Sequence, residues 1–334
     1  MKGFRAYLYA RNSYIMKYIR LKTKDPYYNL ATEEYLLKST DDDIFMLWQN
    51  SPSVIIGKNQ NAYAEVNLSA AKERGVNVCR RITGGGAVYH DLGNVNYTFI
   101  SSSKNAEPLD FESFTRPIIK ALYNMGVDAS LSGRNDIECN GLKISGNAQH
   151  SSNGRILHHG TLLFDTELGA MNELLKVDKE KLVYRAVKSC SSRVANLKQL
   201  TNACADAEDF IAKIGEYVCS DLDAVQCDPP SNNEIDLLAE RNRTSEWIFS
   251  EKRYLTSYTV KRKKKYPFGL VDVEMELERN KIKSIVISGD FFGVEPIEEL
   301  ETFLTQKNVE QLDKIDPSRY IHGMSFEKLL ELLR

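Results

Sequence analysis

Hydrophobic positions recur along this chain with two different spacings, which predict helices in some segments and strands in others. Apolar residues three and four positions apart predict amphipathic helices over Tyr28–Lys38, Phe111–Met125 and Ala207–Leu222. Short apolar runs at Ile44–Trp48 and Ser53–Ile56 predict strands. The longer, N-terminal part of the chain therefore mixes helices with strands.

The last part of the chain predicts a second, smaller α+β unit. Val271–Leu277 and Ile282–Ile287 alternate as strands around a turn at Arg279–Lys281. Helical spacing then returns at Ile297–Leu304 and Phe326–Leu333. With 334 residues, the chain is long enough for a sizeable core and for two domains.

A dense basic run, KRKKK at Lys261–Lys265, precedes these strands. A block of like charges favours a solvated loop. The same charges would also suit a contact surface for an acidic protein substrate. Both interpretations stay open at this point.

Composition excludes several classes of function. Charged residues make up 27% and hydrophobic residues 42%, as in ordinary soluble globular proteins. The net charge of −2 argues against broad nucleic-acid binding, and no apolar run is long enough for a membrane span. The six cysteines include no CxxC pair and the five histidines show no zinc-ligand spacing. We therefore expect reduced thiols in a cytosolic protein and no structural metal.

The first fifteen residues stand apart from the rest. They contain Lys2, Arg5 and Arg11 and no acidic residue, which is compatible with a transit peptide, but the segment is short and only weakly amphipathic. We expect a poorly ordered extension over residues 1–15, with Met16 as an alternative start.

The candidate chemistry concentrates in RRITGGGAVYHDLGNVNY, residues 80–97. Gly84, Gly85 and Gly86 let the backbone approach a ligand closely, and exposed N–H groups in such a turn bind anions. Arg80 and Arg81 add bidentate donors for phosphate or carboxylate. The alternative is a simple hairpin turn between two strands. The stretch matches neither the Walker A loop nor the dinucleotide fingerprint.

This stretch closely resembles the signature of the lipoate–protein ligase A family. Further segments share the resemblance, which runs from about Ile19 to the C-terminus: N-L-A-x-E-E at 29–34, I-G-x-x-Q-N at 56–61, G-R-N-D at 133–136, K-I-S-G-x-A at 143–148, HHGT at 158–161 and S-R-V-x-N-L at 192–197. The resemblance implies an α+β fold, with a mixed or antiparallel sheet in a catalytic domain of the biotin/lipoate ligase type and a smaller α+β domain. We place the catalytic domain at 16–245 and the accessory domain at 246–334.

The family implies a two-step reaction. Lipoate attacks the α-phosphorus of ATP, with Mg²⁺ present, and gives lipoyl-AMP and pyrophosphate. A lysine of an acceptor lipoyl domain then takes the lipoyl group and releases AMP. Expected acceptors are acyltransferase subunits of 2-oxoacid dehydrogenases, the glycine-cleavage H protein, or both. We expect a cytoplasmic monomer, or an organellar matrix protein if the first residues are a transit peptide.

Site residues follow from the motif matches. Lys143 matches the family lysine that contacts both the acyl carboxyl and the α-phosphate. By resemblance, the ATP and lipoyl-AMP site comprises Arg81, Gly84, Gly85, Gly86, Ala87, Val88, Tyr89, Asn135, Asp136 and Lys143. The lipoate pocket comprises Gly57, His159, Gly160 and Lys143, and Asp136 is the candidate Mg²⁺ ligand.

Without the family, these residues allow plainer interpretations. A lysine between Leu142 and Ile144 is usually solvent-facing. The segments at 57–61 and 133–136 also fit solvated turns.

Three other functions remain open. An octanoyl or lipoyl transferase of the same fold would use a cysteine, and none occurs between the HHGT segment and Cys190. Biotin ligase has a related architecture but a different glycine signature. A lipoate-binding protein without turnover would keep the pocket alone.

Overall fold

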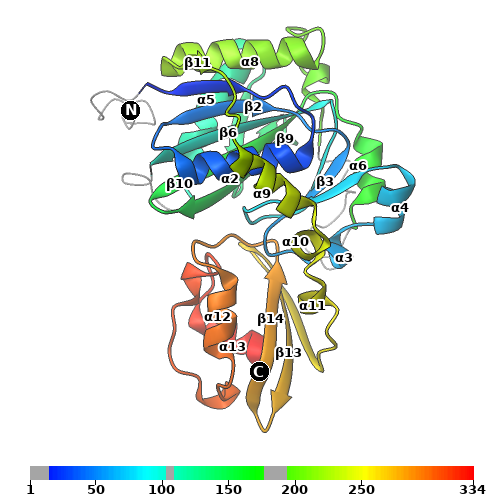
Figure 1. The fold of residues 1–334 in the computed structure, drawn as a ribbon, viewed down its shortest axis with the longest axis vertical. Helices are drawn as coiled ribbons and strands as arrows, with labels where there is room; N and C mark the ends of the chain where they lie inside the picture. The colour runs from blue at the N-terminus through cyan, green and yellow to red at the C-terminus, as the bar shows by residue number, and fades with distance from the viewer. Residues whose placement is uncertain (1–14, 103–108, 177–193) are drawn as a thin grey trace.

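The computed structural model describes residues 15–102, 109–176 and 194–334. Figure 1 shows a larger body, which contains the N-terminal part of the chain, above a smaller body that contains the C-terminus. The predicted extension over residues 1–15 lies, except for Ile15, outside the described residues. None of the described helices is long and apolar enough to cross a lipid bilayer.

A mixed sheet organises the larger body and is the largest sheet among the described residues. Its eight strands, in spatial order, are β11 (Val225–Cys227), β1 (Lys17–Arg20), β2 (Ile44–Trp48), β6 (Asn94–Ser102), β10 (Arg155–Leu163), β9 (Leu142–Ser152), β8 (Asp136–Cys139) and β7 (Ala129–Ser132). The first three are parallel, and every pair from β2 onward is antiparallel. Every residue of β2, β6 and β10 is buried, since both faces of the sheet are covered.

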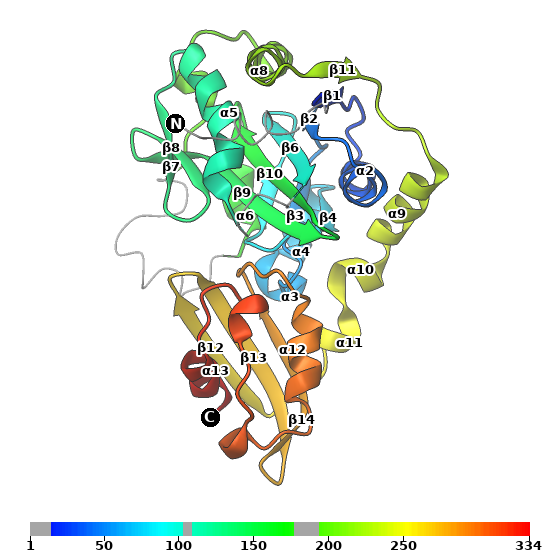
Figure 2. The same cartoon turned by 90° about the vertical axis from the view of Figure 1, so that its left-hand side faces the viewer.

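Helices cover the two faces, as Figure 2 shows. On one face, Phe114 of α5 and Phe210 of α8 belong to the main apolar core. On the other face, Leu30 and Leu37 of α2 pack over β2 and β10, and α9 lies beside α2. Asp25 begins α2 by accepting a hydrogen bond from the Tyr27 backbone N–H, which is the expected capping arrangement. The bounds of these helices are α2 (Pro26–Ser39), α5 (Phe111–Asn124), α8 (Ala207–Leu222) and α9 (Asn233–Arg243).

A separate three-stranded sheet carries the glycine stretch. Strand β4 is parallel to the central strand β3, and β5 is antiparallel to it. The glycines therefore connect strands on opposite edges of β3. The alternative that they form a hairpin turn between paired strands is wrong. The elements of this region are β3 (Ser53–Ile56), α3 (Ala62–Glu65), α4 (Leu68–Glu73), β4 (Asn77–Arg80), β5 (Val88–His90) and α6 (Leu168–Leu174).

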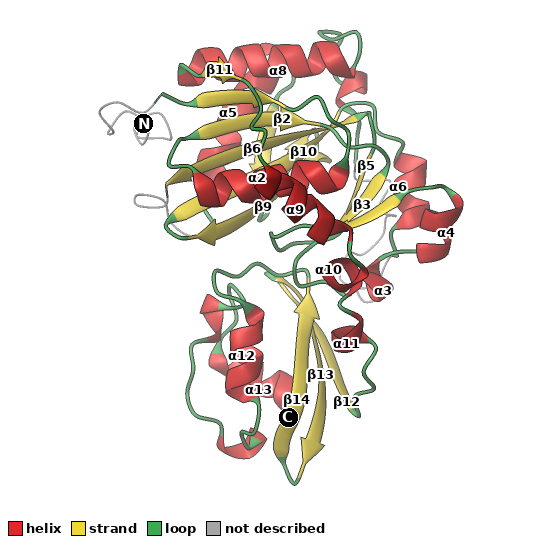
Figure 3. Ribbon diagram, viewed as in Figure 1, coloured by secondary structure: helices red, strands yellow, loops and turns green. Residues whose placement is uncertain are grey.

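The smaller body pairs a three-stranded antiparallel sheet with two helices, which share one apolar core. Its elements are β12 (Val260–Tyr266), β13 (Gly269–Glu278), β14 (Lys281–Gly289), α12 (Ile297–Leu304) and α13 (Phe326–Leu333). Figure 3 shows α10 (Ser245–Phe249) where the two bodies meet and α11 (Glu251–Tyr254) beside the small sheet. The fold class is confirmed, whereas the boundary between residues 245 and 246 stays a prediction.

The basic run is a strand, so the predicted loop is wrong. Lys261–Lys265 lies in β12, at the edge of the small sheet. The Lys261 ammonium lies 2.8 Å from the Glu274 carboxylate on β13, and Lys265 lies 3.3 Å from Asp290. Lysine-rich edge strands resist pairing with other chains, which gives these charges a structural use. A contact with an acidic substrate stays a prediction.

The two bodies meet at the glycine stretch. The Gly85 N–H donates to the Phe291 carbonyl oxygen (3.3 Å), and the Gly289 N–H donates to the Asn59 carbonyl oxygen (2.9 Å). The Phe292 ring is buried, and the Arg134 guanidinium lies over it at 4.5 Å from the ring centroid. The smaller body therefore contacts the same backbone that the sequence predicts as the ligand site.

Candidate functional site

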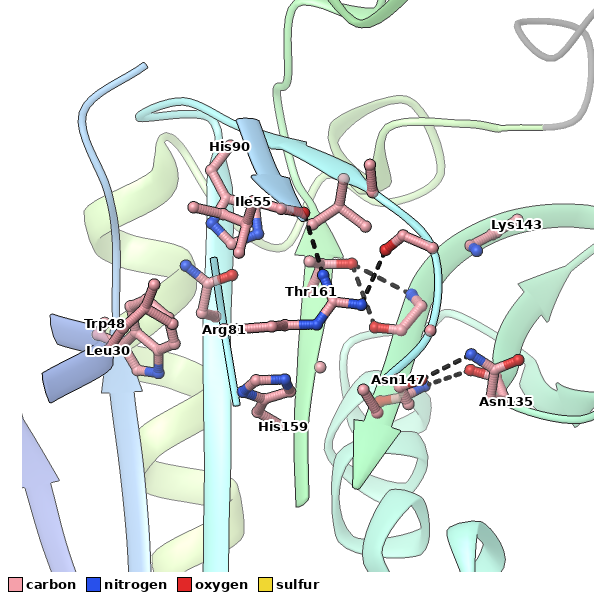
Figure 4. A pocket seen from close by; sticks show the side chains of 18 residues that line it. Leu30, Trp48, Ile55, Arg81, His90, Asn135, Lys143, Asn147, His159 and Thr161 are labelled. Atoms are coloured by element: carbon pink, nitrogen blue, oxygen red, sulfur yellow. Dashed lines mark hydrogen bonds between the residues drawn. The ribbon is translucent and has the colours of Figure 1, made fainter. Parts of the chain in front are cut away.

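A cavity of about 110 Å³ lies where the glycine stretch meets β9, β10 and α2. Figure 4 shows Leu30 and Trp48 at one side of the view and Lys143 at the other, with Arg81 and His159 between them. The cavity thus combines an apolar side with a side that carries an ammonium group. Its lining residues are Leu30, Trp48, Ile55, Arg81, Gly85, Gly86, Ala87, Val88, His90, Asn96, Asn135, Lys143, Gly146, Asn147, Ala148, His159, Gly160 and Thr161.

Arg81 holds the glycine stretch in shape. Its Nη2 donates to the carbonyl oxygens of Gly84 (2.7 Å) and Gly86 (2.8 Å). Its Nη1 donates to the Ile55 carbonyl oxygen (3.0 Å), and its Nε donates to Thr83 Oγ1 (2.8 Å). Burial lowers the pKa of Arg81 to about 10. Because these oxygens use most of the N–H donors of Arg81, its guanidinium mainly holds the loop in place. A contact between Arg81 and a phosphate stays a prediction.

Two glycines are required by close backbone approach. A Cβ on Gly57 would lie 2.1 Å from the Gly85 carbonyl oxygen, so the loop after β3 fits against the glycine stretch only without a side chain. Gly85 has a φ of 90°, which L-residues rarely adopt. These constraints bring two sequence motifs into direct contact, residues 56–61 and the glycine stretch.

The side chain of Lys143 forms part of the cavity wall. It lies in β9, where Nζ makes a 2.7 Å ion pair with Asp136 Oδ1 on β8. A Cβ on Gly146 would lie 2.9 Å from this Nζ, so the small residue makes room for the lysine. The Lys143 carbonyl accepts a hydrogen bond from the Ala195 N–H (3.0 Å). Lys143 is therefore held at both ends and lines the cavity with a side chain that is one-third exposed.

A second polar pair fixes the neighbouring wall. The Asn135 Nδ2 donates to the Asn147 carbonyl oxygen (2.6 Å), and the Asn147 Nδ2 donates to the Asn135 carbonyl oxygen (3.0 Å). The Tyr97 hydroxyl donates to Asn147 Oδ1. A Cβ on Gly160 would lie 2.1 Å from this Asn147 oxygen. Asn147 and Tyr97 were missed by sequence reasoning, although Asn147 stands inside the K-I-S-G-x-A motif.

A buried chain of hydrogen bonds links α2 to the glycine stretch. His159 Nδ1 lies 3.0 Å from Glu33 Oε1, and His159 Nε2 lies 2.9 Å from Thr83 Oγ1. The Thr98 hydroxyl also donates to Glu33 Oε1 (2.6 Å), and it accepts from Trp48 Nε1 (2.8 Å). Glu33 is 2% exposed. The sequence marks Glu33 only as a member of the N-L-A-x-E-E helix motif, and its acidic side chain on the buried side of that helix is the signal that could have identified it.

The structure gathers most predicted residues in one place. Those that line the cavity are Arg81, Gly85, Gly86, Ala87, Val88, Asn135, Lys143, His159 and Gly160. Gly57 and Gly84 lie behind these lining residues. Asp136 is connected to the cavity wall by its ion pair with Lys143. Tyr89 packs with Val54 in an apolar cluster and does not line the cavity. The roles given to these residues stay predictions.

A divalent cation would find one suitable group here. Asp136 offers a one-third exposed carboxylate beside Lys143. Mg²⁺ binds through one or two carboxylates together with water and substrate phosphates, so a single aspartate fits that donor set. The described residues contain no group of three His, Cys, Asp or Glu side chains that could hold a metal ion.

A large mixed sheet next to a small antiparallel sheet makes this an α+β protein of two bodies. The cavity in the larger body has an apolar side, an ammonium group and a glycine stretch, which is a lining that suits an acid and a phosphate. The chain belongs to the lipoyl protein ligase A/B family: residues 25–218 match its catalytic domain. Residues 256–333 match the family described as bacterial lipoate protein ligase C-terminus. The predicted family is thus confirmed.

Individual relatives cover almost the whole chain. The lipoate-protein ligase LplJ of Bacillus subtilis is 37% identical, over 92% of this chain and 97% of its own length. Lipoate–protein ligase 1 of Staphylococcus aureus is 35% identical over 92% and 97%. Among solved structures, P. falciparum LipL1 in complex with lipoate superposes with a TM-score of 0.76 at 25% identity, over 96% of this chain and 97% of its own. A lipoate-protein ligase A bound with ATP gives a TM-score of 0.58 at 25% identity, over 71% and 99%.

Proposed function

We propose that this chain is an ATP-dependent lipoate–protein ligase that forms lipoyl-AMP and transfers the lipoyl group to lysines of lipoyl domains. The observation that supports this most is Lys143, whose ammonium lines a cavity with an apolar side and a glycine stretch. The similar proteins named above are lipoate–protein ligases, and one of the solved relatives holds lipoate while another holds ATP.

In the first step, the lipoate carboxylate oxygen attacks the α-phosphorus of ATP, and the bond to pyrophosphate breaks. The carboxylate and the triphosphate repel each other before they react. Lys143 offsets this repulsion with a charge that Asp136 already orients. Preorganised charge of this kind usually stabilises a transition state more than any other single effect. Mg²⁺, held by Asp136, would neutralise charge on the phosphates.

The glycine stretch supplies backbone donors to the nucleotide. Arg81 fixes the carbonyl oxygens of Gly84 and Gly86, which orients the intervening peptide groups. Donors that are already oriented need no rearrangement during the reaction. Leu30 and Trp48 line the apolar side, where the hydrocarbon part of lipoate is buried away from water.

In the second step, the ε-amine of the acceptor lysine attacks the carbonyl carbon of the mixed anhydride, forms the amide and releases AMP. A solved relative from Thermoplasma acidophilum is described as a bi-partite lipoate protein ligase with its E2 lipoyl domain (TM-score 0.63, 28% identity). Acyltransferase lipoyl domains are therefore the first acceptors to test, and the glycine-cleavage H protein is the second. We place the reaction in the cytoplasm and expect a monomer.

A thiol-dependent transfer is the competing reaction in this fold. None of the described residues that line the cavity is a cysteine. Cys79 is fully buried and its pKa is raised by burial, which is opposite to the activation that a nucleophilic thiol needs. Cys190 lies outside the described residues.

The test is lipoate-dependent exchange of labelled pyrophosphate into ATP in the presence of Mg²⁺. Exchange with lipoate is the expected result, and octanoate and biotin run in parallel to define the acid. If no acid supports exchange but octanoyl carrier protein donates its acyl group, the proposal is wrong and a transferase replaces it. If both assays fail and the protein still binds lipoate, the proposal is also wrong and the chain is a lipoate-binding protein without turnover.

A further inference from the structure

His90 presents a buried, neutral ring to the cavity. It ends β5, is 4% exposed, and lines the cavity wall. Burial lowers the pKa of His90 to about 3, so the ring carries no charge near neutral pH. Its ring meets the Trp48 ring edge to face, with 6.2 Å between centroids.

The proton position on His90 follows from its neighbours. The Asn29 Nδ2 group faces two backbone carbonyls, of Thr23 (3.2 Å) and Gln49 (2.9 Å), which fixes it as the donor. The same group lies 2.9 Å from Asn50, so the atom of Asn50 that faces it is the amide oxygen. The Asn50 Nδ2 therefore faces His90.

These assignments leave one N–H of the His90 ring without an acceptor. The Asn50 Nδ2 lies 3.1 Å from His90 Nδ1, which must accept, so a neutral His90 carries its proton on Nε2. Within the described residues, His90 Nε2 is buried and has no hydrogen-bond partner. Leaving a buried donor without a partner is unfavourable, so a ligand atom that accepts from it would gain binding energy.

The position of His90 indicates which part of a ligand it meets. Figure 4 shows His90 on the side of the cavity that holds Trp48 and Leu30, away from Lys143. If the carboxyl group of the substrate lies at Lys143, the opposite end of the acid lies near His90. In lipoate that end is a five-membered ring with two bonded sulfur atoms, and in octanoate it is a methyl group.

We propose that the Nε2–H of His90 donates a hydrogen bond to a ring sulfur of lipoate and so makes His90 a residue that determines specificity for lipoate over acids without sulfur. This inference rests on the proposed function, because that function places lipoate in the cavity. Sulfur is a weak acceptor, so the preference is modest. A net hydrogen bond of about 0.5–1.5 kcal/mol corresponds to roughly a 2- to 10-fold difference in affinity.

The matched ligand is 5-cyclopentylpentanoate, which keeps the five-membered ring and lacks sulfur. Calorimetric dissociation constants for lipoate and for this analogue give a sulfur preference that does not depend on turnover. We expect the unaltered protein to prefer lipoate by roughly 3- to 10-fold. Equal affinities would overturn the proposal before any variant is made.

Two variants separate the N–H from the shape of the ring. His90→Phe keeps an aromatic ring but donates nothing, and we expect it to reduce the preference to within about twofold. His90→Gln offers an amide oxygen to Asn50 and an amide N–H to the cavity, so we expect it to retain most of the preference. A preference that survives in a folded His90→Phe protein contradicts the proposal.

If His90→Phe does not fold, the dissociation constants of the two ligands are compared in the unaltered protein and in His90→Gln. Both proteins should prefer lipoate, and equal affinities in either one contradict the proposal. A protein that binds both acids without exchanging pyrophosphate contradicts the proposed function, and the binding ratio still tests His90. A protein that binds neither acid contradicts both proposals.

Discussion

The guanidinium of Arg80 donates to the backbone carbonyl of Ile248, with Nη2 at 2.6 Å and Nε at 3.0 Å. The other side of the same guanidinium donates through Nη1 to the carbonyls of Gly57 (3.0 Å) and Gln60 (2.7 Å). In return, Trp247 Nε1 donates to the Arg80 carbonyl oxygen (3.0 Å). Arg80 therefore joins the loop behind the glycine stretch to α10, the helix that leads into the smaller body.

Arg80→Met should destabilise the protein by about 3 kcal/mol or more. Methionine fills a similar volume but leaves several buried carbonyl oxygens without donors, and each such group costs about 1–3 kcal/mol. Urea unfolding followed by tryptophan fluorescence measures the change, because Trp247 lies directly on this contact.

Arg262→Met is the control for the loss of one arginine. Arg262 is exposed on the edge strand, where its guanidinium donates to the adjacent Lys261 carbonyl oxygen. Its substitution should change the free energy of unfolding by less than about 0.5 kcal/mol. If Arg80→Met unfolds at the same urea concentration as this control, Arg80 does not join the two regions energetically.

Gly57→Ala should damage the nucleotide site without unfolding the protein. The new Cβ would meet the Gly85 carbonyl oxygen at 2.1 Å, so the glycine stretch must move. A displacement of about 1 Å at reacting groups can cost about 100-fold in rate. We expect a loss of that order in lipoate-dependent pyrophosphate exchange, with circular dichroism unchanged.

Gly169→Ala is the matched glycine substitution. Gly169 lies in α6, and an added Cβ there meets no atom within 4 Å. Alanine favours the helix by roughly 1 kcal/mol, so this variant should keep its activity and gain slightly in stability. Equal activity of the two alanine variants would show that the glycine stretch tolerates displacement.

Many helices and strands could be predicted from the sequence, because they depend on local pattern. The candidate site residues came from motif matches, and their roles stay predictions. The helix at Ala207–Leu222 has the predicted bounds, since its apolar spacing is continuous and Asp206 caps it. Lys143, His159, Gly85, Gly86 and Gly160 line one cavity, whereas Gly57 and Gly84 do not.

The sequence could not predict which polar groups face each other. Arg81 seemed free for an anion, yet the carbonyls of the glycine stretch take its donors once the loop folds back. Glu33 and His159 are 126 positions apart, and only the packing of α2 on β10 brings them together. Lys261 stands opposite Glu274 on the neighbouring strand and pairs with it, a contact that local composition cannot show.

Buried histidines should make the protein lose stability as the pH falls from 6.5 to 5.5. Burial lowers the pKa of His90 to about 3 and of His150 to about 4, and it lowers the pKa of His158 well below its ordinary value. The unfolded state therefore binds more protons in this range, and stability is lost as the pH falls.

The slope approaches about 4 kcal/mol per pH unit if all three histidines contribute, since each contributes up to about 1.4 kcal/mol per unit. Urea unfolding at several pH values measures it. His158 stacks on Phe114 with 5.2 Å between ring centroids, so His158→Phe should fold and lower the slope by about one third. An unchanged slope would mean that His158 titrates normally.

Lys143→Met should abolish adenylate formation and leave the fold intact. Methionine has a similar reach but no charge, and the loss of one preorganised donor costs on the order of 10²–10³ in rate. The Asp136 carboxylate would lose its 2.7 Å partner, but it is one-third exposed, so water replaces the lysine at little cost. Pyrophosphate exchange and circular dichroism together measure the effect, and near-normal exchange would contradict the role of Lys143.

Asp136→Asn separates metal binding from the support of Lys143. Asparagine keeps the size of the side chain and removes the charge, so the ammonium loses its 2.7 Å ion pair in either case. If Asp136 also holds Mg²⁺, the Mg²⁺ concentration that gives half-maximal exchange should rise by about 10-fold or more. If Asp136 only orients Lys143, the maximal rate falls and the Mg²⁺ midpoint stays in place. We expect the midpoint to shift, because the partly exposed Asp136 carboxylate next to Lys143 is the kind of hard oxygen donor that Mg²⁺ prefers.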